Sequence, residues 1–257
     1  MSEYESKTNY NRNFAPFYNY ALTNQAREYG KFIMEYAQRK NIEHSIVDFM
    51  CGTGTLLKRF ENEGWITTGV DLSSNMLEVA KQQLRHTPLF QEDVSLVKLN
   101  RRFGLAVSTA DAVNHLSNLK TIGDFFESAY NSLSDNGIFI FDLNTEKAVK
   151  NNCSFLVISN KDYISIREGF YDDLHKIGFT RFQGAYRKPG TDLYLRFDSK
   201  IINYIYSLDE IRQLLLDKGF HKVVIRNGYS DESYDKDRAE RVVFICDKKN
   251  ALMSKHK

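Results

Sequence analysis

Apolar and polar positions alternate in two different ways along this chain, and the change divides it into regions. In the first region, short apolar runs are separated by stretches whose apolar residues recur with the spacing of an amphipathic helix. The runs predict strands at 46–49, 67–70, 104–108 and 138–143, with a further strand near Asp93, and the stretches between them predict helices at 24–39, 56–63, 73–84 and 123–133. Strands that alternate with helices are typical of an α/β domain.

The second region runs from Thr145 to Tyr206. Helical spacing disappears, and β-branched and aromatic residues dominate three segments, 155–170, 176–186 and 193–206. Lys188-Pro-Gly-Thr-Asp192, between the last two segments, is a hairpin signal. We therefore predict an inserted antiparallel meander. Because side chains alternate across a strand, about half of its arginines should face solvent. These arginines are Arg167, Arg181, Arg187 and Arg196.

After the meander the helix and strand pattern returns. Ser207-Leu-Asp-Glu210 has the form of a capping box and predicts a helix that ends at Gly219, followed by strands at 222–227 and 241–246. The expected division is an N-terminal lid or helical segment at 1–40, an α/β domain at 41–144 and 207–248, an inserted antiparallel β subdomain at 145–206, and a solvated Lys-rich tail at 249–257.

Composition limits the class of protein. A chain of 257 residues with 42% hydrophobic content can bury one good core, and its formal net charge of +2 gives no general attraction for nucleic acid or an anionic membrane. Three distant cysteines, Cys51, Cys153 and Cys246, argue against a disulfide framework and a zinc cluster, so we expect no metal. No secretion signal or membrane-length apolar run is evident. A cytoplasmic protein without nucleic-acid or membrane partners is expected.

The most informative stretch is the glycine turn after the first predicted strand. Gly52 and Gly54 lead from that strand, which contains Asp48, into a helix. A glycine allows the backbone to pass close to a ligand because it has no Cβ. The next strand ends in Asp71, which is placed to accept hydrogen bonds from ribose hydroxyls. This order indicates a βαβ unit that binds an adenosine ligand.

The loop excludes two kinds of nucleotide. Leu57 replaces the third glycine of the dinucleotide fingerprint, and there is no Lys-Ser or Lys-Thr pair for phosphates. An adenosine cofactor without phosphates fits better. Residues 48–54 resemble motif I of class I S-adenosylmethionine-dependent methyltransferases, which usually has the form D-x-[GA]-[CA]-G-T-G. Met50 departs from this form, and we interpret it as a flexible side chain that fills space beside the strand.

The resemblance continues through four more segments. Residues 70–77 resemble the family's second motif, 91–94 the third, 102–107 the fourth strand, with Gly104 in place of the usual Asp, and 136–142 the turn into the fifth strand. The resemblance implies S-adenosyl-L-methionine as cofactor and a Rossmann-like, seven-stranded, mostly parallel sheet whose last strand is antiparallel. It implies these cofactor-binding residues: Tyr18, Asp48, Met50, Cys51, Gly52, Gly54, Asp71, Leu72, Met76, Asp93, Val94 and Thr109.

An aromatic segment precedes the first strand. Residues 10–18 contain four aromatic side chains and resemble the F-A-x-x-Y-D lid that closes over the cofactor in this family, with Asn19 in place of the Asp. Aromatic residues in such a segment are equally consistent with core packing. Tyr18 is therefore expected either in a lid or in the core.

The loop after the fourth strand supplies the catalytic candidates. It leaves the carboxyl end of a central strand, where ligands collect in α/β sheets, and Asp111, Asn114 and His115 are its polar residues. Asp142 reaches the same edge from the next strand. A sulfonium methyl is already activated, so the protein mainly positions the nucleophile and excludes water, and a base helps to remove a proton. A lone His is also often structural.

The predicted function is methyl transfer from S-adenosyl-L-methionine to N or O of a small-molecule acceptor. The meander resembles the insertion that roofs the acceptor site in macrolide amino-sugar N-methyltransferases, although it could also simply close the pocket or form the contact of a homodimer. Three alternatives stay open: a cyclase or lyase acting on the cofactor's aminobutyryl chain, a non-catalytic S-adenosylmethionine-binding protein, and an NAD-dependent oxidoreductase.

Overall fold

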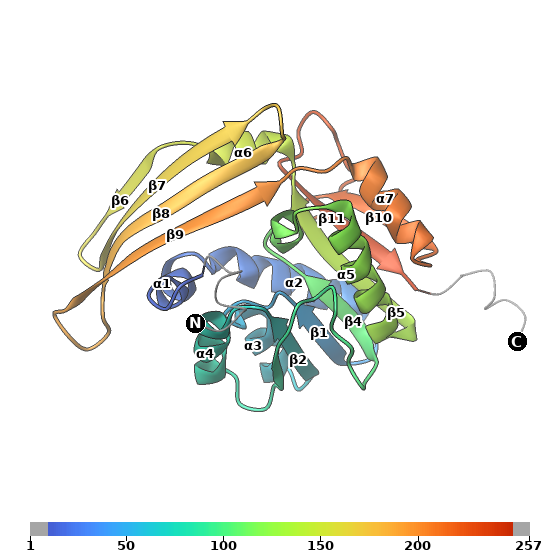
Figure 1. Cartoon of the computed structure of the whole chain (residues 1–257). Helices are drawn as coiled ribbons and strands as arrows, with labels where there is room; N and C mark the ends of the chain where they lie inside the picture. The colour runs from blue at the N-terminus through green and yellow to red at the C-terminus, as the bar shows by residue number, and fades with distance from the viewer. Residues whose placement is uncertain (1–9, 249–257) are drawn as a thin grey trace, which may run out of the picture.

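The computed structural model describes residues 10–248, and the predicted tail at 249–257 and the first nine residues lie outside them. Two sheets are formed (Figure 1). The larger has the strand order β10-β11-β5-β4-β1-β2-β3, and the smaller β6-β7-β8-β9. The strands are β1 Ser45–Phe49, β2 Ile66–Asp71, β3 Leu89–Gln91, β4 Phe103–Ser108, β5 Leu133–Asn144, β6 Leu156–Ser159, β7 Tyr163–Asp172, β8 Ile177–Arg187, β9 Tyr194–Tyr204, β10 Lys222–Asn227 and β11 Arg241–Asp247.

The larger sheet is parallel at its centre. β1 pairs in parallel with β2 and β4, and β4 pairs in parallel with β5, whereas β11 runs antiparallel to both β5 and β10. Every residue of β1 and β4 is buried, because both faces of a parallel sheet are covered by helices. The predicted seven-stranded, mostly parallel sheet with an antiparallel last strand is confirmed.

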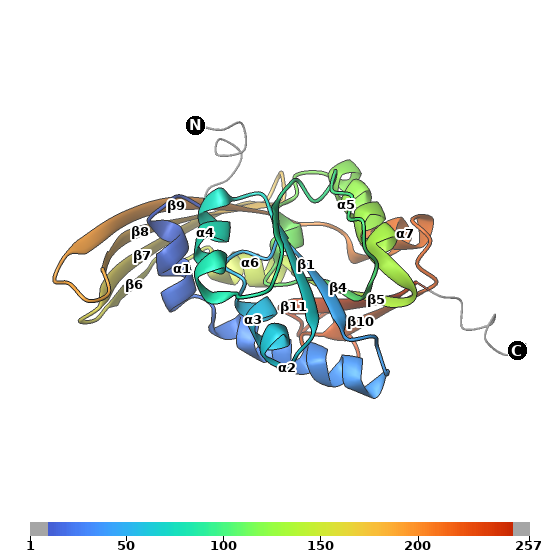
Figure 2. The same cartoon turned by 90° about the horizontal axis from the view of Figure 1, so that it is seen from below.

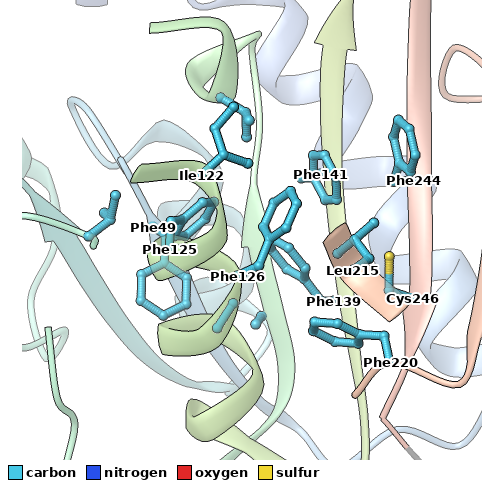
Figure 3. Packing of buried hydrophobic residues seen from close by; sticks show 14 of the residues in the cluster. Phe49, Ile122, Phe125, Phe126, Phe139, Phe141, Leu215, Phe220, Phe244 and Cys246 are labelled. Carbon is cyan, nitrogen blue, oxygen red and sulfur yellow. The ribbon is translucent and has the colours of Figure 1, made fainter. Parts of the chain in front are cut away.

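Helices cover both faces of this sheet (Figure 2). The helices are α1 Phe14–Ala21, α2 Asn24–Arg39, α3 Thr55–Asn62, α4 Ser74–Gln83, the 3₁₀ turn η2 Ala112–His115, α5 Leu119–Ser132, α6 Glu146–Asn152 and α7 Leu208–Asp217. Apolar side chains of α2, α3 and α4 pack on one face. On the other face, Phe125 and Phe126 of α5 and Leu215 of α7 pack against phenylalanines of β5 and β11 (Figure 3).

Two predicted boundaries in the α/β part are corrected. Helix α5 begins at Leu119, four residues earlier than predicted, because the Asn118 side chain caps it by accepting from the Thr121 amide at 2.8 Å. The turn predicted at 134–137 lies inside β5, where the pairing of β4 with β5 shifts register between Phe103 and Leu105. Helix α7 begins where predicted, but no side-chain cap from Ser207 is present in the described structure, so the predicted capping box does not form.

The inserted region also differs from the prediction. It contains the helix α6, which Thr145 caps by accepting from the Ala148 amide, and this helix is too short to show helical spacing in the sequence. The segment 155–170 forms two strands, β6 and β7, because Asn160 Oδ1 accepts from the amides of Asp162 and Tyr163 and turns the chain. The meander is therefore a four-stranded antiparallel sheet preceded by a helix.

Helix α1 packs between the inserted sheet and helix α4 of the α/β part. Phe14 and Phe17 are fully buried, and the Phe17 ring stacks on Phe197 of β9 with a centroid distance of 4.0 Å. On its other side α1 packs against α4 through Ala15 and Met76. The inserted sheet therefore extends over α1 and the edge of the larger sheet (Figure 1). No helix within residues 10–248 is long and apolar enough to cross a membrane.

Candidate functional site

A cavity of about 340 Å³ lies at the carboxyl ends of β1, β2 and β4, a size typical of small-molecule sites. Nine of the predicted cofactor-binding residues line it, namely Tyr18, Met50, Gly52, Asp71, Leu72, Met76, Asp93, Val94 and Thr109. Strand β9 adds Lys200, Ile201, Ile202 and Tyr204. The inserted sheet therefore forms part of the cofactor cavity, which the sequence did not reveal.

The glycine turn leaves room for a ligand. Gly52 has a φ of +54°, and a Cβ built on it would meet no atom of the described residues within 4 Å, so a side chain there would project into open space. Gly54 has a different role. Its Cβ would lie 2.7 Å from Leu84 Cδ1 and 3.2 Å from Ala80 Cβ, so Gly54 allows α3 to pack closely against α4. Gly54 does not line the cavity.

Asp71 and Asp93 present acceptors to this cavity. Asp71 accepts from the amides of Gly52 at 2.7 Å and Ser73 at 2.8 Å through different oxygens, and each oxygen can accept a second bond. Burial raises the pKa of Asp71, and the Ser73 and Gly52 amides oppose this shift. Asp93 Oδ1 accepts from the amide and hydroxyl of Ser95 at 2.9 and 2.7 Å. Two carboxylates with remaining acceptor capacity fit the ribose and adenine groups of S-adenosyl-L-methionine.

Two other predicted contacts lie behind the cavity lining. Asp48 is 2% exposed, and its Oδ1 has no hydrogen-bond partner in the described part of the chain. Burial raises the pKa of Asp48 well above its ordinary value, and Asp71 raises it further. Cys51 is also buried and lines neither this cavity nor its neighbour. Asp48, Cys51 and Gly54 therefore lie behind the lining of both cavities, where they support the loop, and their part in cofactor binding stays a prediction.

Met50 combines strain with packing. Its φ is +59°, in the left-handed region that costs a non-glycine residue about 1–2 kcal/mol. It packs partly buried against the core cluster and also lines the cavity. The usual Gly at this position of the motif thus has a conformational reason.

A second cavity of about 380 Å³ adjoins the first. The two share five lining residues, Tyr10, Tyr18, Ala110, His115 and Ile201. The second cavity extends to the start of α2, to β7 and β8 of the inserted sheet, and to Arg241 of β11. Tyr18 lies at the boundary, and it is half-buried beside the aromatic cluster of α1. The loop with the catalytic candidates therefore separates a cofactor-sized cavity from a neighbouring one.

His115 is held in one tautomer at this boundary. Its Nδ1 lies 2.9 Å from the Ile202 carbonyl oxygen, which can only accept, so Nδ1 carries the proton. Nε2 is then an acceptor, and the Tyr10 hydroxyl donates to it at 3.4 Å. Burial raises the pKa of Tyr10 well above its ordinary value, so Tyr10 stays protonated at neutral pH. The sequence marked Tyr10 as one of several aromatics and gave no signal of this contact.

Asp111 is fixed by a buried ion-pair network. Arg241 donates from Nη2 to Asp111 Oδ1 at 2.9 Å and from Nη1 to Asp142 Oδ2 at 2.8 Å, and Asn203 donates to Asp111 Oδ2 at 3.1 Å. Asp142 also accepts from the amides of Ala110 and Asp111, two residues with positive φ. Asp142 is fully buried and occupied, so it is unsuited to act as a base. Sequence reasoning missed Arg241, which it placed only in the last strand.

Asn114 does not belong to the cavity lining. It is 1% exposed, its Nδ2 donates to the carbonyls of Asn144 and Tyr204, and its Oδ1 accepts from the Asn144 amide. It lines neither cavity. These hydrogen bonds hold the loop to β5 and β9, which favours a structural role, and the predicted catalytic role of Asn114 stays a prediction.

The register of the inserted sheet determines which of its four arginines faces a cavity and which face solvent. Arg181 pairs with Asp198 and Arg187 with Asp162 at the surface, while Arg196 is exposed. Arg167 lines the second cavity. Within residues 10–248 no group of three or more His, Cys, Asp or Glu side chains is arranged to hold a metal ion.

Comparison with protein families finds a methyltransferase domain at residues 47–139. Over 209 residues the chain is 27% identical to a protein of Geobacillus sp. (strain WCH70) that is named as a methyltransferase, without a named acceptor. The match covers 79% of this chain and 84% of that protein. Over 98 residues it is 33% identical to the dTDP-3-amino-3,4,6-trideoxy-alpha-D-glucopyranose N,N-dimethyltransferase of Streptomyces venezuelae, covering 38% of this chain and 41% of that enzyme.

Two solved structures share the fold over most of the chain. An S-adenosylmethionine-dependent methyltransferase from Clostridium acetobutylicum ATCC 824 matches with a TM-score of 0.80 at 22% identity, covering 92% of this chain and 98% of that one. The sugar N-methyltransferase KedS8 from Streptoalloteichus sp ATCC 53650 matches with a TM-score of 0.73 at 16% identity, covering 91% and 92%. The predicted fold class is confirmed by these likenesses.

Proposed function

We propose that this chain, which is an S-adenosylmethionine-dependent methyltransferase, methylates an amine nitrogen of a small-molecule acceptor held in the second cavity. The predicted methyltransferase activity is confirmed by the domain match at residues 47–139, and the predicted cofactor is the one named for the solved structure from Clostridium acetobutylicum. The acceptor and the roles of individual residues are the proposal. It is supported by the two adjoining cavities and by the base at their boundary.

The first cavity suits the cofactor. Asp71 would hold the ribose hydroxyls and Asp93 the adenine amino group, while Gly52 leaves the space that the ligand needs. When bound, S-adenosyl-L-methionine supplies a methyl group on a sulfonium, which needs no further activation. The remaining task of the protein is to place the acceptor nitrogen, remove its proton and exclude water.

His115 is the proposed base, and its hydrogen bonding is the observation that carries the proposal. With Nδ1–H bonded to Ile202, Nε2 carries the lone pair of a residue that lines both cavities, and the acceptor would have to displace the long 3.4 Å hydrogen bond that Tyr10 donates to it. An acceptor ammonium in the second cavity could lose its proton to Nε2 before attack. The Asp111 carboxylate, held by Arg241 and Asn203, would orient the ammonium by accepting a hydrogen bond from it.

The choice of an amine and of a small molecule has two supports. The relative from Streptomyces venezuelae is named as an N,N-dimethyltransferase of an amino sugar nucleotide, and KedS8 is named as a sugar N-methyltransferase. The second cavity is lined by residues of the inserted sheet, α1 and α2 and has a volume of about 380 Å³, which suits a small molecule better than a macromolecule.

A paired-substrate assay tests the proposal. Purified protein is incubated with methyl-labelled S-adenosyl-L-methionine and a panel of amino sugars, each matched with the sugar that has a hydroxyl in place of the amine. We expect S-adenosylhomocysteine to form and the label to appear on nitrogen. Label on the matched hydroxyl sugars would show that the methyl group goes to oxygen and would contradict the proposed amine acceptor. Release of methylthioadenosine would instead support a cyclase or lyase that acts on the cofactor's aminobutyryl chain. The Asp71→Ala variant, in which we expect weaker cofactor binding, is the control.

A further inference from the structure

Arg167 is a cation in the second cavity without a matching anion. It extends from β7, its side chain is half-buried, and it lines this cavity. Its Nη2 donates to the neutral hydroxyl of Ser154 at 3.1 Å, and its Nε is buried with no hydrogen-bond partner in the described structure. Among residues 10–248 it forms no ion pair, unlike Arg181 and Arg187 on the same sheet.

No other charged side chain in the described lining of the second cavity neutralises the positive charge of Arg167. The other charged side chains there are Asp111 and Arg241, which pair with each other, and Arg241 is further paired with Asp142 behind the lining. A guanidinium stays protonated in proteins and loses hydration when it is partly buried. An unpaired one is therefore unfavourable unless a ligand supplies the counter-charge.

The start of α2 adds to the positive character of the same cavity. Residues 23–26 line it, and no side chain within the described residues caps this 16-residue helix, because the Thr23 hydroxyl donates to the Asn19 carbonyl instead. The first amides of a helix carry partial positive charge and attract anions. Alone this would not define a site, but it agrees with the unpaired arginine.

We propose that the methyl acceptor carries an oxyanion, a carboxylate or a phosphate, and that Arg167 binds it. This rests on the proposed function, because it takes the second cavity as the acceptor site. The planar guanidinium can donate to two oxygens of one such group, and the negative charge of that group would supply the ion pair that Arg167 lacks among the described residues. With the Asp111 carboxylate in the same lining, the cavity then matches a molecule that has both an amine and an oxyanion.

Calorimetry with simple anions tests the assignment without turnover. Inorganic phosphate and acetate are titrated separately into wild-type protein, with and without saturating S-adenosylhomocysteine. We expect one of them to bind with a stoichiometry of one, and which of them binds more tightly tells phosphate from carboxylate. Arg167→Gln should weaken this binding about tenfold or more, since it removes a charge-assisted pair.

Two variants keep the result interpretable. Arg196→Gln removes an exposed arginine of the same sheet and should leave anion binding unchanged. Arg167→Lys keeps the charge and should retain part of the affinity even if the Gln variant unfolds. Wild-type protein that binds neither anion, or an Arg167→Gln variant that is folded and binds as wild type, overturns the assignment. Failure of S-adenosylhomocysteine to bind would count against the proposed function, and the titration without it still decides the role of Arg167.

Discussion

Replacing Arg241 by Met should destabilise the protein strongly. The side chain is 17% exposed and contacts two carboxylates, of which Asp142 is fully buried and Asp111 is 22% exposed. Burial by itself would lower the pKa of Arg241, but Asp142 and Asp111 raise it well above its ordinary value, so Arg241 stays a cation in the native state. Arg241→Met removes the cation and leaves two carboxylates close to each other.

The size of the effect follows from this arrangement. Removing one partner of a buried ion pair costs about 3–5 kcal/mol. Asp142 keeps its bonds from the Ala110 and Asp111 amides, and water can reach Asp111, so we expect the lower end, about 3 kcal/mol of unfolding free energy. For a chain of this size each kcal/mol shifts Tm by about 2–4 °C, which gives a decrease of about 6–12 °C. The loss should shrink as pH falls, since burial already raises the pKa of Asp142 and protonation then removes the orphaned charge.

Urea denaturation at pH 7.5 measures the free energy, with Arg238→Met as control. Arg238 pairs with Asp235 at the surface and is 73% exposed, so its loss should change stability far less than the loss of Arg241. Combining Arg241→Met with Asp142→Asn should recover part of the stability, because the second change removes the unpaired buried charge. A loss below about 1 kcal/mol for Arg241→Met, or a double variant less stable than the single one, would refute this reasoning.

Three further outcomes are expected. Asp71→Ala should weaken S-adenosylhomocysteine binding by about 1–3 kcal/mol in calorimetry, because ribose hydroxyls lose their acceptor, and unchanged affinity would remove Asp71 from the ribose site. Asp48 has a folded pKa above its unfolded value, so its contribution to stability should fall by about 1.4 kcal/mol per pH unit from about pH 4 up to the folded pKa, and the difference in unfolding free energy between wild type and Asp48→Asn should show this slope in denaturation at several pH values. His115→Ala should lower turnover about 10²-fold with little change in cofactor affinity, and an equal rate with an early thermal transition would identify His115 as structural.

Local pattern predicted the part of the fold that local interactions determine. The strands β1, β2 and β4 and the helices α2, α3 and α4 lie within one or two residues of their predicted bounds, because apolar periodicity, glycine turns and the Ser73 cap act over a few residues. The cofactor motif was recognisable for the same reason. Asp71 reaches Gly52 across only 19 residues.

Contacts between distant segments could not be predicted. Arg241 meets Asp111 across 130 residues, His115 meets Tyr10 across 105, and the register that places Arg167 in the cavity depends on three strand pairings. The sequence also carried no signal of the partners of Asn114, because the backbones of β5 and β9 that it contacts are distant along the chain. The sequence alone predicted a cofactor site, and the tertiary structure was needed before an acceptor cavity could be proposed.

Strand β9 has a consequence for how this enzyme could be re-engineered. Ile201 of β9 lines both cavities, and the carbonyl of Ile202 accepts the hydrogen bond from His115 Nδ1. Phe197 of the same strand stacks on Phe17 of α1. Exchanging the whole inserted sheet for that of another enzyme would thus change three things at once. These are the lining of the second cavity, the hydrogen bond that orients the His115 ring, and the surface on which α1 packs. Exchange of β6 to β8 alone, with β9 retained, would keep the Ile202 carbonyl that holds the imidazole tautomer and the Phe197 ring that stacks on α1. It would still replace the β7 and β8 aromatics that pack on Phe14 and Phe17, so these positions would have to be kept in the exchanged strands.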